Sequence, residues 1–142
     1  MVLPVRYASS ALVFDESGRV LLIRQNYAAR KYGVPGGMVE FGETPTEAAI
    51  REVREETEVD VALGVLSGLY TLRKDDHTLL CYVFLATIER GEPAVPSTGE
   101  IAEVGWFEYD ALPKPATSLV APAVEDARAG RVGVAREIPF VR

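Results

Sequence analysis

The chain has 142 residues, of which 48% are hydrophobic and 25% charged, and its formal net charge is -6. This composition is typical of one globular domain, expected to span residues 1–142, and it excludes a disordered chain. The acidic balance and the lack of a Lys/Arg run argue against a nucleic-acid partner, because such proteins are usually basic.

The chain order begins with two expected strands. One covers residues 7–15 and the other residues 19–25, and the polar turn at 15–18 predicts that they form a hairpin. Residues 33–37, with the sequence GVPGG, predict a loop with unusual backbone geometry.

The clearest helix is expected over residues 44–56. Thr44 suits the N-cap, Pro45 suits the first helical position, and Glu47 completes a capping box. The carboxylates of Glu52, Glu55 and Glu56 fall together on one face, following the i, i+3, i+4 rule.

The second half of the chain is richer in strands. Its pattern predicts an extended segment at 59–72 with a break near 67–68, a turn at 74–77, strands at 78–88 and 104–108, a helix at 118–129, and a tail at 132–141 that fits no single element. The order of strands, helix, strands and helix favours a mixed α/β sandwich over a repeating βαβ fold.

The acidic helix face has two interpretations. It is either an ordinary solvated surface or a site for a cation that relieves the repulsion between three neighbouring carboxylates. Mg²⁺ suits such ligands, because it is a hard ion that binds oxygen atoms and keeps several waters. One cysteine and one histidine are too few for a zinc site, and Cys81, in an apolar run, is expected to be a buried thiol.

These residues belong to a longer pattern. Gly37 is followed at fixed spacing by Glu43, Arg51-Glu52-Val53, Glu55-Glu56 and Glu58-Val59. The pattern resembles the Nudix box, with Glu58 in place of the usual glycine. A glutamate in the left-handed conformation of that glycine would cost about 1 kcal/mol, so we expect the helix to end differently.

The resemblance extends from about Ala8 to Pro113, and includes Glu40 and the late Gly105-Trp106-Phe107. It implies a Nudix-type α-β-α sandwich with a mixed central sheet. It also implies a pyrophosphohydrolase that acts on phosphoric anhydrides in nucleoside di- or triphosphate derivatives. Mg²⁺ would be the cofactor, with Mn²⁺ as a substitute.

The resemblance also assigns site residues. Metal ligands would be Glu52, Glu55, Glu56 and the Gly37 carbonyl, and Glu52 is also a candidate general base. Arg51 and Glu43 would form an orienting pair. A further carboxylate ligand would be Glu100 or Glu103, and the spacing from Trp106 favours Glu100. Candidates for substrate binding are Arg24, Tyr32, Gly36 and Gly37, and candidates for a base pocket are Arg24, Tyr27, Tyr32, Tyr70 and Phe84.

In the family that the pattern resembles, residues outside the Nudix box determine substrate specificity. Residues 74–77 contain neither the proline associated with ADP-ribose cleavage nor the tyrosine associated with dinucleoside polyphosphates, which leaves a nucleoside triphosphate or a nucleotide sugar. A non-catalytic nucleotide sensor is the alternative, although such domains commonly lose box carboxylates. An isoprenoid isomerase would want a catalytic cysteine. A homodimer is compatible with the family, and the absence of signal and membrane segments predicts a cytoplasmic protein.

Overall fold

The computed structural model describes residues 2–139 and contains two sheets. A five-stranded mixed sheet has the order β4-β1-β6-β5-β8, and a three-stranded antiparallel sheet has the order β3-β2-β7. The elements are β1 (Val5–Val13), β2 (Val20–Gln25), β3 (Tyr32–Gly33), β4 (Gly36–Met38), α1 (Pro45–Thr57), β5 (Asp60–Arg73), β6 (Thr78–Arg90), β7 (Ile101–Phe107), α2 (Val120–Arg128) and β8 (Val134–Ile138).

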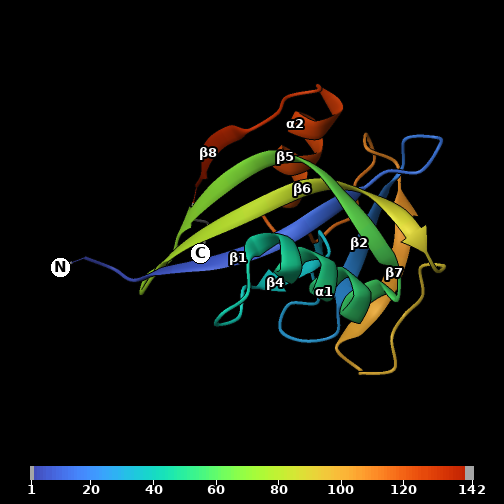
Figure 1. The fold of residues 1–142 in the computed structure, drawn as a ribbon, viewed down its shortest axis with the longest axis horizontal. Helices are drawn as coiled ribbons and strands as arrows, with labels where there is room; N and C mark the ends of the chain where they lie inside the picture. The colour runs from blue at the N-terminus through green and yellow to red at the C-terminus, as the bar shows by residue number, and fades with distance from the viewer. Residues whose placement is uncertain (1, 140–142) are drawn as a thin grey trace.

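The two helices lie on opposite sides of the long strands (Figure 1). Helix α1 packs against β1, β4 and β5, and α2 packs against β5. This arrangement confirms the expected α-β-α sandwich with a mixed central sheet.

Alternate side chains of β1 pack into two different hydrophobic clusters, one beneath each helix. Ala11 and Val13 pack into the cluster that contains Val53 of α1, whereas Leu12 packs into the cluster that contains Val124 of α2. Successive side chains of a strand point to opposite faces, so the second half of β1 is buried on both sides and ends in the continuous apolar run Ala11-Leu12-Val13, whereas its first three residues are exposed.

The expected hairpin of the first two strands is wrong. The turn exists, with the Gly18 amide donating to the Asp15 carbonyl, but β1 and β2 belong to different sheets and are joined only by an isolated bridge between Phe14 and Val20. The reason is that both edges of β1 are occupied, by β6 in parallel over nine residue pairs and by β4.

Three other segments refine the sequence predictions. The expected loop at 33–37 contributes to two short strands, β3 and β4, and the ambiguous tail contains β8, which pairs in parallel with β5. Residues 140 and 141 of that tail lie outside the described residues. The break expected near 67–68 is confirmed, because the β5–β6 register shifts between Leu66 and Gly68.

Helix α1 begins as the sequence predicts. Thr44 is its N-cap, Pro45 its first residue, and Glu47 completes the capping box. Its end differs from the expectation, because Glu58 does adopt the left-handed conformation, with φ 65° and ψ 20°, and its amide donates to the Arg54 carbonyl. The chain thus accepts the conformational cost at this position to end the helix where a glycine would.

Cys81 is a buried thiol, as expected, and burial raises its pKa to about 11. This burial gives no support to a nucleophilic cysteine. Within residues 2–139, no helix has the length and apolar character needed to cross a membrane.

Candidate active site

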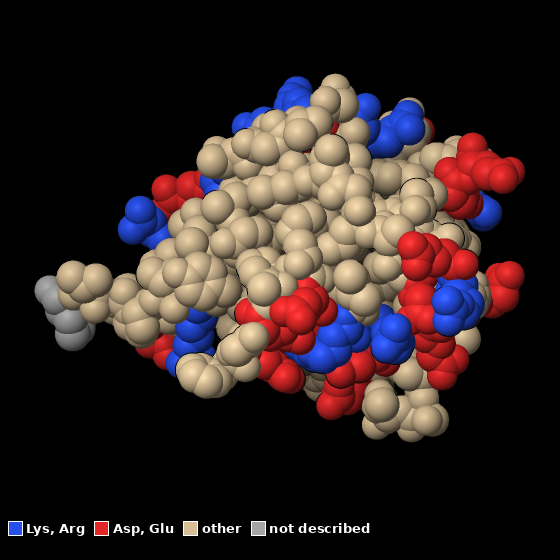
Figure 2. Space-filling view, in the orientation of Figure 1, with Lys and Arg blue, Asp and Glu red and all other residues tan. Residues whose placement is uncertain are grey.

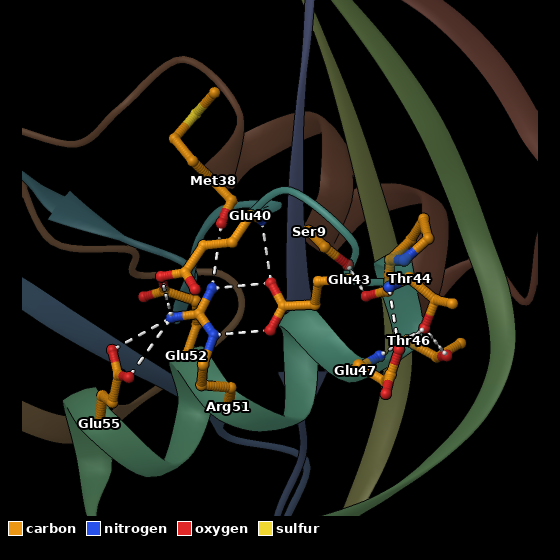
Figure 3. A network of polar contacts seen from close by, with 11 residues as sticks. Ser9, Met38, Glu40, Glu43, Thr44, Thr46, Glu47, Arg51, Glu52 and Glu55 are labelled. Atoms are coloured by element: carbon orange, nitrogen blue, oxygen red, sulfur yellow. Dashed lines mark hydrogen bonds and ion pairs between the residues drawn. The ribbon is translucent and has the colours of Figure 1, made fainter.

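Arg51 is the centre of the polar network on α1 (Figure 3). Its guanidinium donates two hydrogen bonds to Glu43, at 2.7 and 3.0 Å, and a third at 3.1 Å to the Met38 carbonyl. It also lies 2.9 Å from Glu52 and 3.3 Å from Glu55. The hydrogen bond from Arg51 holds the pKa of Glu43 at about 2, and the resulting ion pair ties the loop after β4 to the helix.

Two glycines allow β4 to approach its neighbours closely. A Cβ at Gly37 would lie 2.5 Å from the carboxyl carbon of Glu52, and a Cβ at Gly36 would lie 2.3 Å from the Cβ of Ser10. Any larger residue would push β4 away from β1 and α1. The backbone of Gly37 therefore lies directly beside a candidate metal-ligating carboxylate.

Glu56 lies on the same helix face and is partly buried. The Gly36 amide donates to its Oε1 at 2.8 Å. Burial raises the pKa of Glu56 to about 8, against the effect of that hydrogen bond, and the Glu52, Glu55 and Glu100 carboxylates raise it further. The negative charge at this position is therefore poorly compensated by the protein alone.

Glu52 and Glu55 differ in exposure. The Glu52 side chain is 17% exposed and that of Glu55 is 56% exposed. Burial raises the pKa of Glu52, and the hydrogen bond from Arg51 opposes that effect. Both carboxylates share one guanidinium, which Glu52 contacts through Oε1 and Glu55 through both of its oxygens.

Glu100 lies just before β7 and Glu103 lies within that strand, and only Glu100 acts electrostatically on Glu56 of the cluster. The Glu100 carboxylate contributes to the raised pKa of Glu56, whereas Glu103 accepts a hydrogen bond from the Tyr32 phenol and raises the pKa of that group. This arrangement favours Glu100 over Glu103 as the additional ligand.

Of the four aromatic candidates for a base pocket, Tyr27 is 53% exposed and the other three are buried. Tyr32 is buried, with the Arg24 guanidinium 5.2 Å from its ring centroid and Phe107 at its edge. Tyr70 and Phe84 are core residues, since Tyr70 is fully buried and Phe84 is 8% exposed, and they offer no open face to a base. The apolar sequence around Tyr70 and Phe84 could not tell a core position from one that lines a binding pocket.

The cluster as a whole has an excess of negative charge. Four carboxylates, those of Glu40, Glu43, Glu52 and Glu55, share Arg51 as a partner. Figure 2 shows acidic and basic side chains intermingled on the side of the molecule where Figure 1 places α1. Such an all-oxygen donor set suits a hard divalent cation. In the described residues, however, no three acidic, His or Cys side chains are arranged as a ready metal site, so binding would require carboxylates to turn away from Arg51.

Asn26 was not identified from the sequence. Its backbone N–H donates to the Glu100 carbonyl and its side-chain Nδ2 donates to the Gly99 carbonyl, both at 2.9 Å. An isolated asparagine in a polar loop gives no signal that it joins two segments more than 70 residues apart.

Comparison with known proteins agrees with this geometry. The family model for the NUDIX domain matches residues 4–127. The chain is 31% identical to an ADP-ribose pyrophosphatase of Methanocaldococcus jannaschii, over 72% of this chain and 62% of that protein. It is 32% identical to a Bacillus subtilis protein provisionally named as an 8-oxo-dGTP diphosphatase, over 72% of this chain and 66% of that protein.

The chain therefore spans less than two thirds of the length of these two curated relatives. Among solved structures, it resembles the MutT NUDIX hydrolase of Burkholderia pseudomallei with a TM-score of 0.79 and 30% identity, over 86% of this chain and 97% of that one. Proteins of this family generally use divalent metal ions. The matched residues, the shared fold and the carboxylate cluster on α1 together show that the chain belongs to the NUDIX domain family.

Proposed function

We propose that this protein hydrolyses a diphosphate linkage in a nucleotide derivative, with the acidic face of α1 as the catalytic site. The observation that carries the proposal is the position of Glu56. It is a partly buried carboxylate with a pKa of about 8, surrounded by the carboxylates of Glu52, Glu55 and Glu100. A divalent cation would relieve this repulsion, and the same cation would attract a diphosphate.

Mg²⁺ is the proposed cofactor, and Mn²⁺ is a substitute with similar oxygen ligands. Glu52, Glu55, Glu56, Glu100 and the Gly37 carbonyl would hold it. When bound, the ion would neutralise charge on the diphosphate and favour ionisation of water.

The residues of the chain would divide the remaining work. A carboxylate of the cluster, Glu52 among the candidates, would take the proton from the attacking water. Arg51 and Glu43 would keep the loop after β4 against the helix, so that Gly36 and Gly37 present their backbone close to the ligands. Arg24, beside Tyr32, is the candidate for contact with the nucleoside.

The proposed substrate is a nucleoside triphosphate, including an oxidised one, or a nucleotide sugar. The names of the relatives support a nucleotide derivative, but they point to different members of that class. The substrate must therefore be identified by measurement.

The test is a turnover assay with Mg²⁺ on a panel of nucleoside triphosphates, oxidised triphosphates, ADP-ribose, nucleotide sugars and diadenosine polyphosphates. We expect one class to be hydrolysed by the wild type. EDTA should abolish the activity, and Glu56→Gln should lower it by a factor of about 10³, which is within the usual range for loss of a catalytic group.

Glu58→Gln is the matched control, because it removes an exposed carboxylate just beyond the same helix. It should retain wild-type turnover. Nucleotide binding without turnover of any panel member would contradict the hydrolase proposal and favour the sensor alternative.

A further inference from the structure

The loop between β2 and β3, residues 26–31, has an unusual backbone. Ala28 and Arg30 both have positive φ, at 49° and 52°, although neither is a glycine. Such conformations persist only when surrounding contacts hold them, and they concentrate at functional sites.

Asn26 supplies those contacts. Its backbone N–H donates to the Glu100 carbonyl, and its side-chain Nδ2 donates to the Gly99 carbonyl. Its side-chain Oδ1 accepts a hydrogen bond from Arg30 Nη1, and each of these three distances is 2.9 Å. The Arg30 amide donates back to the Tyr27 carbonyl at 2.9 Å. One asparagine thus ties the loop to the segment that carries Glu100 and fixes the turn that contains Tyr27.

Tyr27 lies at this turn with 53% of its surface exposed. The preceding residue, Asn26, is hydrogen-bonded to the Gly99 and Glu100 carbonyls, which places this turn beside the segment that carries Glu100. The Glu56, Glu100 and Glu52 carboxylates also act electrostatically on the Tyr27 phenol. Desolvation raises the pKa of Tyr27, and these carboxylates raise it further, so the phenol is a neutral hydrogen-bond donor at neutral pH.

A donor at this position has a chemical use. A diphosphate bound over the carboxylates would need donors for its own oxygens, and Arg51 is already shared among four glutamates. We propose that Tyr27 is a substrate-binding residue whose hydroxyl donates to the substrate's diphosphate, and that Asn26 is the positioning residue that holds it there. This inference rests on the proposed function for its ligand class.

The test measures binding of α,β-methylene-ADP, a diphosphate with a bridge that water does not cleave, by calorimetry in the presence of Mg²⁺. Tyr27→Phe should weaken binding about tenfold, the effect of losing one hydrogen bond to a charged group. Tyr109→Phe is the matched control, because Tyr109 is similarly exposed, at 43%, but its ring packs under Arg128. It should bind like the wild type.

Asn26→Ala tests the positioning role. It should weaken binding about as much as Tyr27→Phe, and the double variant should be less impaired than the product of the two single effects, because both act through one hydroxyl. With a hydrolysed substrate, Tyr27→Phe should raise KM about tenfold and leave kcat nearly unchanged, as for uniform binding.

The outcomes separate this inference from the hydrolase proposal. Wild-type affinity in Tyr27→Phe, equal losses in Tyr27→Phe and Tyr109→Phe, or fully independent effects of Asn26 and Tyr27 would overturn it. If the wild type binds the probe but hydrolyses nothing, the hydrolase proposal fails, and the comparison of variants still decides the role of Tyr27. A wild type that does not bind the probe with Mg²⁺ would overturn the inference directly.

Discussion

Two ionic clusters lie on the two helices, and their charge balance is opposite. On α1, one guanidinium, that of Arg51, is shared by four carboxylates. On α2, one carboxylate, that of Asp126, accepts hydrogen bonds from Arg131, Arg136 and the Tyr70 phenol, all within 2.9 Å.

The partners explain what each cluster does. Asp126 is 2% exposed, and the hydrogen bonds from Arg136 and Tyr70 lower its pKa to about 2, so its charge is fully compensated within the protein. Through Tyr70 of β5 and Arg136 of β8, it joins α2 to the edge of the five-stranded sheet. The α1 cluster instead holds negative charge that the protein does not neutralise. A balanced cluster stabilises the fold, whereas an unbalanced one can bind a ligand of opposite charge.

The largest effect is expected from a substitution that disrupts the Asp126 cluster on α2. Asp126→Asn should lower the free energy of unfolding by about 3 kcal/mol, because it removes the charge that two arginines and a phenol surround. Urea unfolding measures the loss, and turnover per folded molecule should stay at the wild-type level. Glu125→Gln, which changes the exposed neighbouring carboxylate, should unfold like the wild type. Equal stabilities of Asp126→Asn and Glu125→Gln would show that the α2 cluster is not a stabilising unit.

A smaller effect concerns acid stability. The folded pKa of Asp126 is below its ordinary value of 3.8, so its contribution is present above about pH 4 and is lost as the pH falls towards 2. This contribution is about 2 kcal/mol, from the size of the pKa shift. The difference in unfolding free energy between the wild type and Asp126→Asn should narrow by that amount between pH 5 and pH 2. A difference in unfolding free energy that stays constant from pH 5 to pH 2 would contradict the lowered pKa of Asp126.

Glu56 should show the opposite pH dependence. Its folded pKa, about 8, is above the ordinary value of 4.5, so it costs stability increasingly as the pH rises from about 4.5 to 8. Without metal, Glu56→Gln should therefore be more stable than the wild type at pH 8, by about 1 kcal/mol after solvent screening, and equal to it at pH 4. A glutamine keeps an oxygen to accept from the Gly36 amide. If Glu56→Gln were less stable than the wild type at pH 8, the protein would already compensate the negative charge of Glu56.

The smallest expected effect is that of the cation itself. At about five times its Kd, Mg²⁺ should stabilise the wild type by about 1 kcal/mol, which raises Tm by about 3 °C for a chain of this size. Thermal unfolding with and without Mg²⁺ measures this shift. Glu56→Gln should show a smaller shift, and Asp126→Asn should keep the full shift from its lower starting Tm. Equal shifts in the wild type and Glu56→Gln would place the cation elsewhere.

The accuracy of the sequence predictions depended on the range of the interactions. Local signals predicted α1 well, since Thr44, Pro45 and Glu47 act within one turn and the three glutamates share a face at helical spacing. The hairpin prediction failed because strand pairing is not local, and β1 has β6 and β4 at its edges instead of β2. Glu58 was expected to alter the helix end, but it adopts the left-handed conformation itself.

By itself, the sequence determined the family, the acidic helix face and the residue types available to bind a hard cation, because these depend on fixed spacing along one helix. Only the tertiary structure decided which distant groups join that face. It buried Tyr70 beside Asp126, and it joined the Tyr27 loop to the segment that carries Glu100 through Asn26. Those contacts connect segments from separate parts of the chain, and their free energy depends on packing that no local pattern encodes.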